Sequence, residues 1–486
     1  MSEVALPSRP RLADHAMPRR HFIDGAEIVV VHDTRSGDLV RMPPRAWAVI
    51  EAADGTRDMS GVLLAASQRP DPLRPSEVAA VLTDLMGAGL LTDGIDPFAF
   101  EPMEADVAAN APLDVLDFAL TCDGSGACCA TYSTVRFSEI EADRARSLLP
   151  DLEGGRARRF LPLVGSGAQP QRAATLIDGR CGYLGADAAC EIHRRGGFGA
   201  KPAGCAIYPA TFAWDGAAVR VSLGVECACV AKSLDSRGGS PLVPEAARAR
   251  SDLPEGAQIV VVPDRIEVRA GVTAPREAIV AWSREVLAAM GGAPRGSAAI
   301  DGAPRGASVL DVVAIAWALA AKIEAGETSA ESVRAALDEA RGGPPSFDAL
   351  SPWIEALRER AAAKREAADR WRSIGDRVRR ASALLADAAE AMNDPVVLAE
   401  AIVGTGAPRA LEAFYFRSNV HGHGMIGEAP LATALRDRAT RVLFGRAVAR
   451  LAEERGSDLA PPGTWLTLVE AMMRAQGLKE YARAIG

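Results

Sequence analysis

The sequence predicts a mainly α-helical protein with small β elements, and three observations support this. Aromatic residues make up only 5% of the 486 residues and alanine is abundant, which favours helices. From Ser308 to the end, apolar residues recur at helical spacing. At roughly 150 residues per domain, the length suffices for about three domains. We expect an N-terminal domain (18–95), a loop-rich cysteine domain (112–275) and a C-terminal helical bundle (308–486).

The N-terminal segment predicts a β-hairpin followed by three helices. Glu27–Val31 and Leu39–Met42 are apolar runs on either side of a Ser-Gly-Asp turn. Helices are then expected from Pro43-Pro44 to about Asp54, over Met59–Ser67 and over Ser76–Met86. This order of elements predicts a small winged-helix-like unit.

This segment resembles the PqqD-like fold, which recognises peptides in ribosomal peptide modification systems. The resemblance rests on the hairpin, on the W-x-x-I helix that contains Trp47, and on the L-x-x-x-G-L-L string that begins at Leu85. It implies a peptide or protein substrate as a partner. Such a segment could pair with the hairpin edge near Glu27–Val31.

Two linkers separate the expected domains. Residues 94–112 contain three prolines, and the string GAPRG occurs twice between Gly291 and Gly306. Before the second linker, Gln258–Val262 and Arg265–Arg269 are expected to be two strands of a hairpin with a Pro-Asp turn.

All eight cysteines lie between residues 122 and 229, and three quarters of the chain has none. They are Cys122, Cys128, Cys129, Cys181, Cys190, Cys205, Cys227 and Cys229. In a reducing compartment such clustering indicates metal or redox chemistry more than disulfides. Buried structural cysteines are the alternative, because the thiol is among the most buried side chains.

The spacing of the cysteines excludes a zinc ribbon but leaves the metal open. Glycines inside C-x₅-CC allow a tight loop whose amides point toward thiolates. In Val219–Cys229 apolar residues alternate with others, which predicts a strand with Cys227 and Cys229 on one face. Thiolates suit an iron–sulfur cluster or zinc equally well.

The string C-x₅-CC, C-x-Y-L, C-x-I-H, K-P-x-x-C and Y-P resembles the YkgJ-type cysteine-cluster family of zinc- or iron-chelating proteins. Distant relatives of that family include flagellin lysine-N-methylase, in which a cysteine-rich region precedes a helical part. The resemblance implies that the cysteines are metal ligands, with one or both of Cys227 and Cys229 among them. It also implies a [4Fe–4S] cluster and, for the methylase, S-adenosylmethionine as the methyl donor. Many family members have a further cysteine where this chain has Ser125, which leaves the ligand count of a second centre open.

A few residues outside the cysteines are candidates for function. His193 could be a ligand or a structural histidine, and Lys201 a cation beside the cluster or a surface lysine. The G-x-G-x-x-G string at 422–427, with His421 and His423, lacks the preceding strand of a nucleotide site and is expected to be a loop between helices. No residue stands out as catalytic, and Glu139 and Glu141 are expected to lie in the first turn of a capped helix.

The C-terminal region contains one clear buried stripe and a solvated basic face. The stripe is formed by Trp371, Ile374, Val378, Ala381, Leu385, Ala388 and Met392. The basic face contains Arg377, Arg379 and Arg380.

Charge and hydropathy limit the location and the partners. A net charge of −8 makes nucleic acid an unexpected partner. The longest apolar run, Val312–Ala321, is too short for a membrane span, and residues 1–22 lack the apolar core of a secretory signal. We expect a cytoplasmic metalloprotein that modifies a peptide or protein side chain, for example by lysine N-methylation. The alternatives are a zinc- or iron-binding structural or adaptor protein, and a redox or metal-handling protein.

Overall fold

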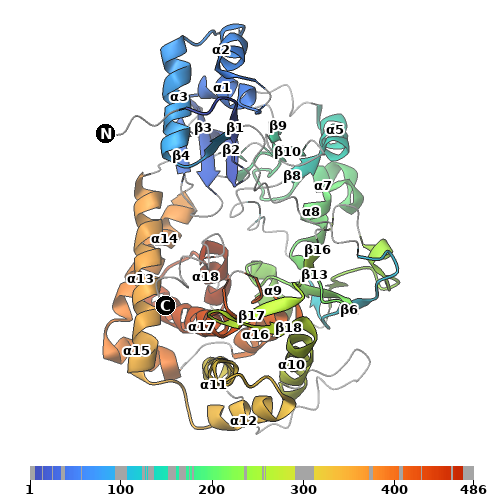
Figure 1. The fold of residues 1–486 in the computed structure, drawn as a ribbon, viewed down its shortest axis with the longest axis vertical. Helices are drawn as coiled ribbons and strands as arrows, with labels where there is room; N and C mark the ends of the chain where they lie inside the picture. The colour runs from blue at the N-terminus through green and yellow to red at the C-terminus, as the bar shows by residue number, and fades with distance from the viewer. Residues whose placement is uncertain are drawn as a thin grey trace. The chain divides into compact units, whose positions relative to one another are not determined.

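The computed structural model divides the chain into two compact units (Figure 1). Unit 1 comprises Met1–Glu104, Gly124–Ala206 and Ala367–Val378, and unit 2 comprises Ala105–Asp123, Ile207–Glu366 and Arg379–Gly486. The structure describes residues 6–13, 15–23, 26–33, 39–55, 57–69, 71–93, 107–122, 126, 129, 136–150, 160–163, 171–174, 176–177, 180–234, 238–253, 257, 259–290, 311–370, 376–403, 409–427, 429–460 and 463–473. The expected linker at 291–306 and most of the one at 94–112 lie outside these residues. The described part is mainly α-helical with small sheets, as predicted.

The N-terminal part of unit 1 contains the expected hairpin and three helices. Strands β3 (Ala26–Asp33) and β4 (Leu39–Met42) pair antiparallel. They are followed by α1 (Ala46–Ala52), α2 (Met59–Ser67) and α3 (Pro75–Gly87), whose apolar faces share one core with Val29, Val31 and Trp47.

Three strands that the sequence did not indicate complete this part of unit 1. Strand β2 (Ala16–Ile23) pairs with the whole of β3, and β1 (Pro10–Leu12) pairs with β5 (Leu91–Asp93). The expectation that the Glu27–Val31 edge is available to a peptide is wrong, because β3 lies between β2 and β4. Strands β2, β3 and β4 belong to one five-stranded sheet, and β4 is the strand at one end of it.

The remainder of unit 1 is assembled from short elements. Its strands are β8 (Arg136–Ser138), β9 (Phe160–Leu163), β10 (Gln171–Ala174), β11 (Leu176–Ile177) and β12 (Arg180–Cys181), and its helices are α5 (Glu139–Leu148), α7 (Glu191–Gly196), the 3₁₀ turn η1 (Phe198–Ala200) and α8 (Ala203–Ile207). Helix α5 begins with the expected capping box, in which Ser138 and Glu141 bond each other's backbone N–H groups. The acids of its first turn are therefore structural.

Unit 2 contains a four-stranded sheet in the order β16-β13-β14-β6. These strands are β16 (Ile259–Val261), β13 (Ala210–Trp214), β14 (Val219–Leu223) and β6 (Leu113–Val115). The strand expected over Val219–Cys229 is too long, because β14 ends at Leu223 and helix α9 (Ala228–Leu234) contains Cys229. Cys227 and Cys229 therefore do not share a strand face. Two short strands, β7 (Ala119–Leu120) and β15 (Ser240–Pro241), form a separate pair.

The hairpin expected from Gln258 to Arg269 is also wrong in its pairing. Strand β16 pairs parallel with β13, whereas β17 (Arg265–Arg269) pairs with β18 (Val272–Pro275). Both predicted strands exist, but each has a partner that is not its neighbour across the Pro-Asp turn. The turn separates two sheets.

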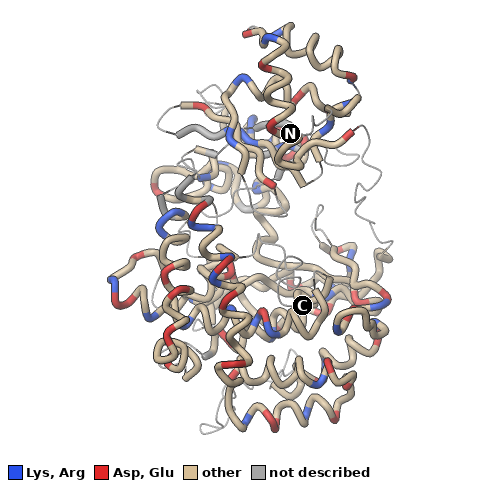
Figure 2. Tube along the Cα trace, turned by 60° about the vertical axis from the view of Figure 1, so that its left-hand side comes forward, with Lys and Arg blue, Asp and Glu red and all other residues tan. Residues whose placement is uncertain are grey.

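The helices of unit 2 surround the long helix α17 (Leu431–Glu454). It packs against α11 (Val312–Glu324), α15 (Pro395–Val403) and α18 (Trp465–Met473), and α17 and α18 lie side by side in Figure 1. The other helices are η2 (Arg250–Asp252), α10 (Arg276–Ala289), α12 (Ala330–Ala340), α13 (Phe347–Arg370), α14 (Asp376–Ala391) and α16 (Arg409–His421). Basic and acidic residues are interspersed along these helices (Figure 2).

The stripe predicted along α14 is buried from Ala381 onward, whereas Val378 at its start is partly exposed. Ala381, Leu385 and Ala388 are at most 1% exposed, and Met392, just after the helix, is fully buried. Trp371, Ile374 and the side chain of Arg377 lie outside the described residues. In the part searched, no helix is both long and apolar enough to cross a membrane.

Candidate functional site

Unit 1 brings three of the predicted ligands into one small core. Cys181 is buried, and Cys129 and Cys190 are partly buried against the same apolar cluster, which contains Tyr183. The backbone N–H of Leu184 donates to the carbonyl of Cys181 at 2.9 Å. Leu184 also forms an isolated β-bridge with Cys190. The turn between residues 181 and 190 therefore presents both cysteines to the core that contains Cys129.

The glycine loop before Cys129 packs directly on this turn. Gly126 has a φ of +64°, and a Cβ at this position would overlap the carbonyl oxygen of Ala188 and approach the Leu184 Cδ1 atom to 2.8 Å. Only glycine allows both the left-handed backbone and the close approach. Gly126, three residues before Cys129, therefore packs tightly against the turn between Cys181 and Cys190.

The other predicted residues of unit 1 lie on neighbouring helices. Cys205 is partly buried on α8, and the backbone N–H of Ala203 at the start of this helix donates to Glu141 Oε1 at 2.6 Å. His193 is exposed on α7, and Lys201 is partly exposed before α8. Cys128 lies outside the described residues.

Unit 2 contains Cys122, Cys227 and Cys229, the first exposed and the other two buried. The chain next to Cys122 is joined to α9, because the Thr121 N–H donates to Ser233 Oγ at 2.9 Å. The Ser233 hydroxyl in turn donates to the carbonyl of Cys229 at 2.7 Å. These hydrogen bonds connect the segment that contains Cys122 to the helix that contains Cys229.

The donor chemistry fits a thiolate-bound metal, because unit 1 gathers sulfur donors around a glycine loop with a left-handed residue. Among the residues searched, no three His, Cys, Asp or Glu side chains are arranged to hold an ion. A ligand set built on unit 1 would therefore need a donor outside the described residues, such as Cys128, or a different arrangement of the described thiols.

The G-x-G-x-x-G string is a loop between α16 and α17, as expected. A Cβ on Gly422 would lie 2.5 Å from the Cβ of Ser222 on β14. The Ser222 hydroxyl donates to the carbonyl of Ser418 at 2.7 Å. The first glycine thus serves close packing of a helix end on a strand.

His421, at the end of α16, and His423, in the loop, are both buried, and His423 lies near Asp215. His421 Nε2 lies 3.0 Å from the carbonyl oxygen of Asp114, and burial lowers the pKa of His421. His423 Nε2 lies 3.9 Å from Asp215 Oδ2, and neither ring nitrogen has a hydrogen-bond partner within the described structure. Burial raises the pKa of Asp215, but His423, two backbone N–H groups and Arg220 outweigh it, so the pKa lies well below the ordinary value.

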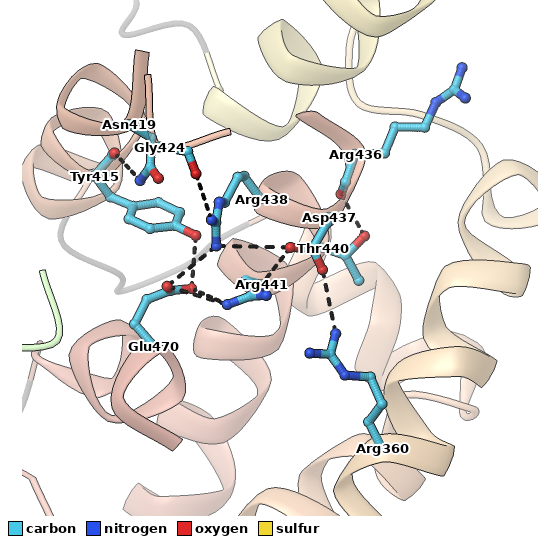
Figure 3. A network of polar contacts seen from close by, with 10 residues as sticks. All are labelled: Arg360, Tyr415, Asn419, Gly424, Arg436, Asp437, Arg438, Thr440, Arg441 and Glu470. Atoms are coloured by element: carbon cyan, nitrogen blue, oxygen red, sulfur yellow. Dashed lines mark hydrogen bonds and ion pairs between the residues drawn. The ribbon is translucent and has the colours of Figure 1, made fainter. Parts of the chain in front are cut away.

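A second polar site lies among the helices of unit 2, and we call it the ionic cluster. It consists of Arg360 and Lys364 on α13, Tyr415 on α16, Asp437, Arg438 and Arg441 on α17, and Glu470 on α18. Figure 3 shows the side chains of Arg438 and Arg441 directed toward Glu470, with Arg360 approaching Asp437 from α13.

Close contacts hold the acidic members of the ionic cluster in place. Asp437 Oδ2 lies 2.8 Å from Arg441 Nε, and Glu470 accepts a 2.8 Å hydrogen bond from the Tyr415 hydroxyl. Burial raises the pKa of Tyr415 well above its ordinary value, so Tyr415 remains a donor. Although burial opposes it, the guanidiniums of Arg441 and Arg438 lower the pKa of Glu470, which stays ionised.

The sequence analysis missed the ionic cluster. Its residues come from four helices, so no spacing along the chain connects them. One local signal existed, because Asp437 and Arg441 lie in a part of α17 where residues such as Ala434 and Phe444 are fully buried. Charged residues at buried positions of a helix require partners from neighbouring helices.

No model of a known protein family matches this chain, and neither a curated protein nor a solved structure matches it.

Proposed function

We propose that this chain is a cysteine-ligated metal protein, with an iron–sulfur cluster, [4Fe–4S], as the metal group. The observation that carries the proposal is the packing of Gly126 on the turn that ends at Cys190. That packing places Cys129 in one core with Cys181 and Cys190. A [4Fe–4S] cluster is held by four cysteine thiolates, and the three cysteines of this core, which come from two distant segments, would supply part of that set.

The ligands would come from the eight clustered cysteines. In unit 1 these are Cys128, Cys129, Cys181, Cys190 and Cys205, and in unit 2 they are Cys122, Cys227 and Cys229. A bound cluster would supply redox or Lewis-acid chemistry. The chain's own contribution would be the glycine loop, whose amides stabilise thiolates, and the Tyr183 core, which limits access of water.

The activity that we propose is modification of a peptide or protein side chain, such as lysine N-methylation with S-adenosylmethionine as donor. It rests on the resemblance to the YkgJ-type proteins and to flagellin lysine-N-methylase. The PqqD-like, winged-helix-like segment would hold the substrate. Because β3 is covered on both sides, the end strand β4 (Leu39–Met42) replaces Glu27–Val31 as the proposed pairing edge.

A structural or adaptor role with bound zinc or iron is the second candidate. It is favoured by the small core around the cysteines, where Phe137 and Tyr183 are the buried aromatic side chains among the described residues. A metal could hold such a short-element domain together. In that case metal removal would unfold this part of unit 1.

Two measurements separate the candidates. Calorimetry with S-adenosylmethionine on metal-loaded chain should show saturable binding if the chain is a methylase, and no heat of binding would reject that activity. Chelation followed by circular dichroism tests the structural role. Unfolding on metal loss, together with no cosubstrate binding, would favour the adaptor function.

A further inference from the structure

The basic side chains of the ionic cluster outnumber its carboxylates. Asp437 lies 2.8 Å from Arg441 Nε and 3.6 Å from the nearest nitrogen of Arg360. Glu470 is shared by Arg441, at 3.3 Å, and Arg438, at 3.5 Å. Lys364 adds an ammonium group beside Arg360 and Arg441. Even with Arg360 left aside, three cations face two carboxylates, so the described cluster has excess positive charge.

The guanidinium donors of the cluster are not saturated by these contacts. The contacts of Arg441 and Arg438 with Glu470 exceed the roughly 2.8 Å of a full charge-assisted hydrogen bond. Arg438 donates to the carbonyl of Gly424 at 3.1 Å, but its buried Nε has no hydrogen-bond partner among the described residues. Buried guanidinium donors without acceptors are costly, and a bound acceptor would remove that cost.

Lys364 gives the cluster a partly exposed cation. It lies one turn beyond Arg360 on α13 and is only partly exposed. Burial, together with the neighbouring guanidiniums of Arg360 and Arg441, lowers its pKa to about 8. The neighbouring positive charges thus repel the ammonium group of Lys364. An anion bound beside Lys364 would offset this repulsion.

We propose that the ionic cluster binds a phosphoryl group, with Lys364, Arg438 and Arg441 as the residues that contact its oxygens. Planar guanidinium groups and a lysine ammonium are the side chains that proteins use for phosphate. The excess positive charge of Lys364, Arg438 and Arg441 over Asp437 and Glu470 also favours an anionic group over a neutral one. The site does not depend on the cysteines, so it stands whether or not the chain binds metal.

The test uses the full-length chain and inorganic phosphate, titrated calorimetrically against chloride of equal ionic strength. We expect saturable binding by the wild-type chain, at least about tenfold weaker binding by K364M, and nearly unchanged binding by K364R. K322M is the matched control. Lys322 lies on α11 and pairs with Glu339, so its loss should leave phosphate binding unchanged.

A second measurement needs no variant. Phosphate should slow acylation of Lys364 by an amine reagent in the wild-type chain, while the acylation of Lys322 stays constant, as peptide mass spectrometry can follow. Competition by O-phosphoserine would assign the site to a phosphoryl group on a larger molecule, and binding of inorganic phosphate alone would assign it to the free ion. No saturable phosphate binding, equal binding by K364M, or equal competition by a dicarboxylate would overturn the proposal.

Discussion

Arg220 Nε lies 2.7 Å from Asp215 Oδ2, and both side chains are almost completely buried, at 5% and 0% exposed. The same carboxylate accepts the backbone N–H groups of Ala217 and Ala218 at 2.8 and 2.7 Å. It thereby closes the turn between β13 and β14 and holds a buried guanidinium in the sheet of unit 2.

D215N should destabilise unit 2 by about 3 kcal/mol, because it leaves the buried Arg220 with its more exposed partner Asp114. Urea unfolding at neutral pH measures this free energy. The control is D264N, which removes an 87% exposed partner of Arg276 and should cost less than about 1 kcal/mol. Equal losses in the two variants would show that the buried pair has no special role.

Because of the lowered pKa of Asp215, we expect the folded chain to lose stability in acid. The pKa of Asp215 is lower in the folded chain than its unfolded value of 3.8, so its contribution is complete above that pH and is lost as the pH falls below it. Wild-type stability should therefore fall between about pH 4 and about pH 2 more steeply than that of D215N, as urea unfolding across this range would show. Parallel curves for the two chains would contradict the lowered pKa.

G422A should destabilise unit 2 by about 2 kcal/mol, because the new methyl group would lie 2.5 Å from the Cβ of Ser222. S222G should recover most of this loss in the double variant, which thermal unfolding can measure. G424A is the control, since its Cβ would meet the end of the Asn419 side chain, which can move. A double variant no more stable than G422A would exclude this contact as the cause.

Sequence reasoning predicted local elements well where the signal is local. The three helices after β4, the capping box at Ser138 and the buried stripe from Ala381 to Met392 all follow from short-range patterns. The β3–β4 hairpin was predicted, but the other strand partners depend on the whole fold, and the sequence did not indicate them. Nothing near Ile259 indicates that β16 joins β13, which lies far earlier in the chain.

The site was predicted unevenly for the same reason. Clustering of cysteines in the sequence pointed to Cys129, Cys181 and Cys190, which do share a core. The pattern from Val219 to Cys229 misled because hydrophobic alternation continues past Leu223, where the strand ends and a helix soon begins. The ionic cluster could not be predicted from sequence spacing, because its charged residues come together only when the helices pack.

G126A should lower the metal content of the purified chain to less than about half, because alanine is disfavoured at φ +64° and would push the loop away from Ala188. Iron and zinc per chain are measured by elemental analysis. The control is G204A, next to Cys205, whose Cβ meets no atom within 4 Å. If G126A retained its full metal content, Gly126 would not be required for metal binding.

Lys364 should react with amine reagents faster than Lys322 between pH 7 and pH 9. Its pKa of about 8 leaves more of the neutral amine in this range, whereas the pKa of Lys322 is raised by its hydrogen bond with Glu339. Acylation rates of the two peptides, followed by mass spectrometry as the pH changes, give the comparison. A midpoint for Lys364 near that of an ordinary lysine would contradict the lowered pKa.

The central claim, that the clustered cysteines hold a metal, is tested most directly by analysing iron, zinc and acid-labile sulfide in chain purified without oxygen, together with its visible absorption spectrum. The account predicts iron with matching sulfide and a broad charge-transfer band. Zinc without sulfide would support the structural alternative instead. A purified chain that contains neither metal, and takes up neither when it is offered, would contradict the claim.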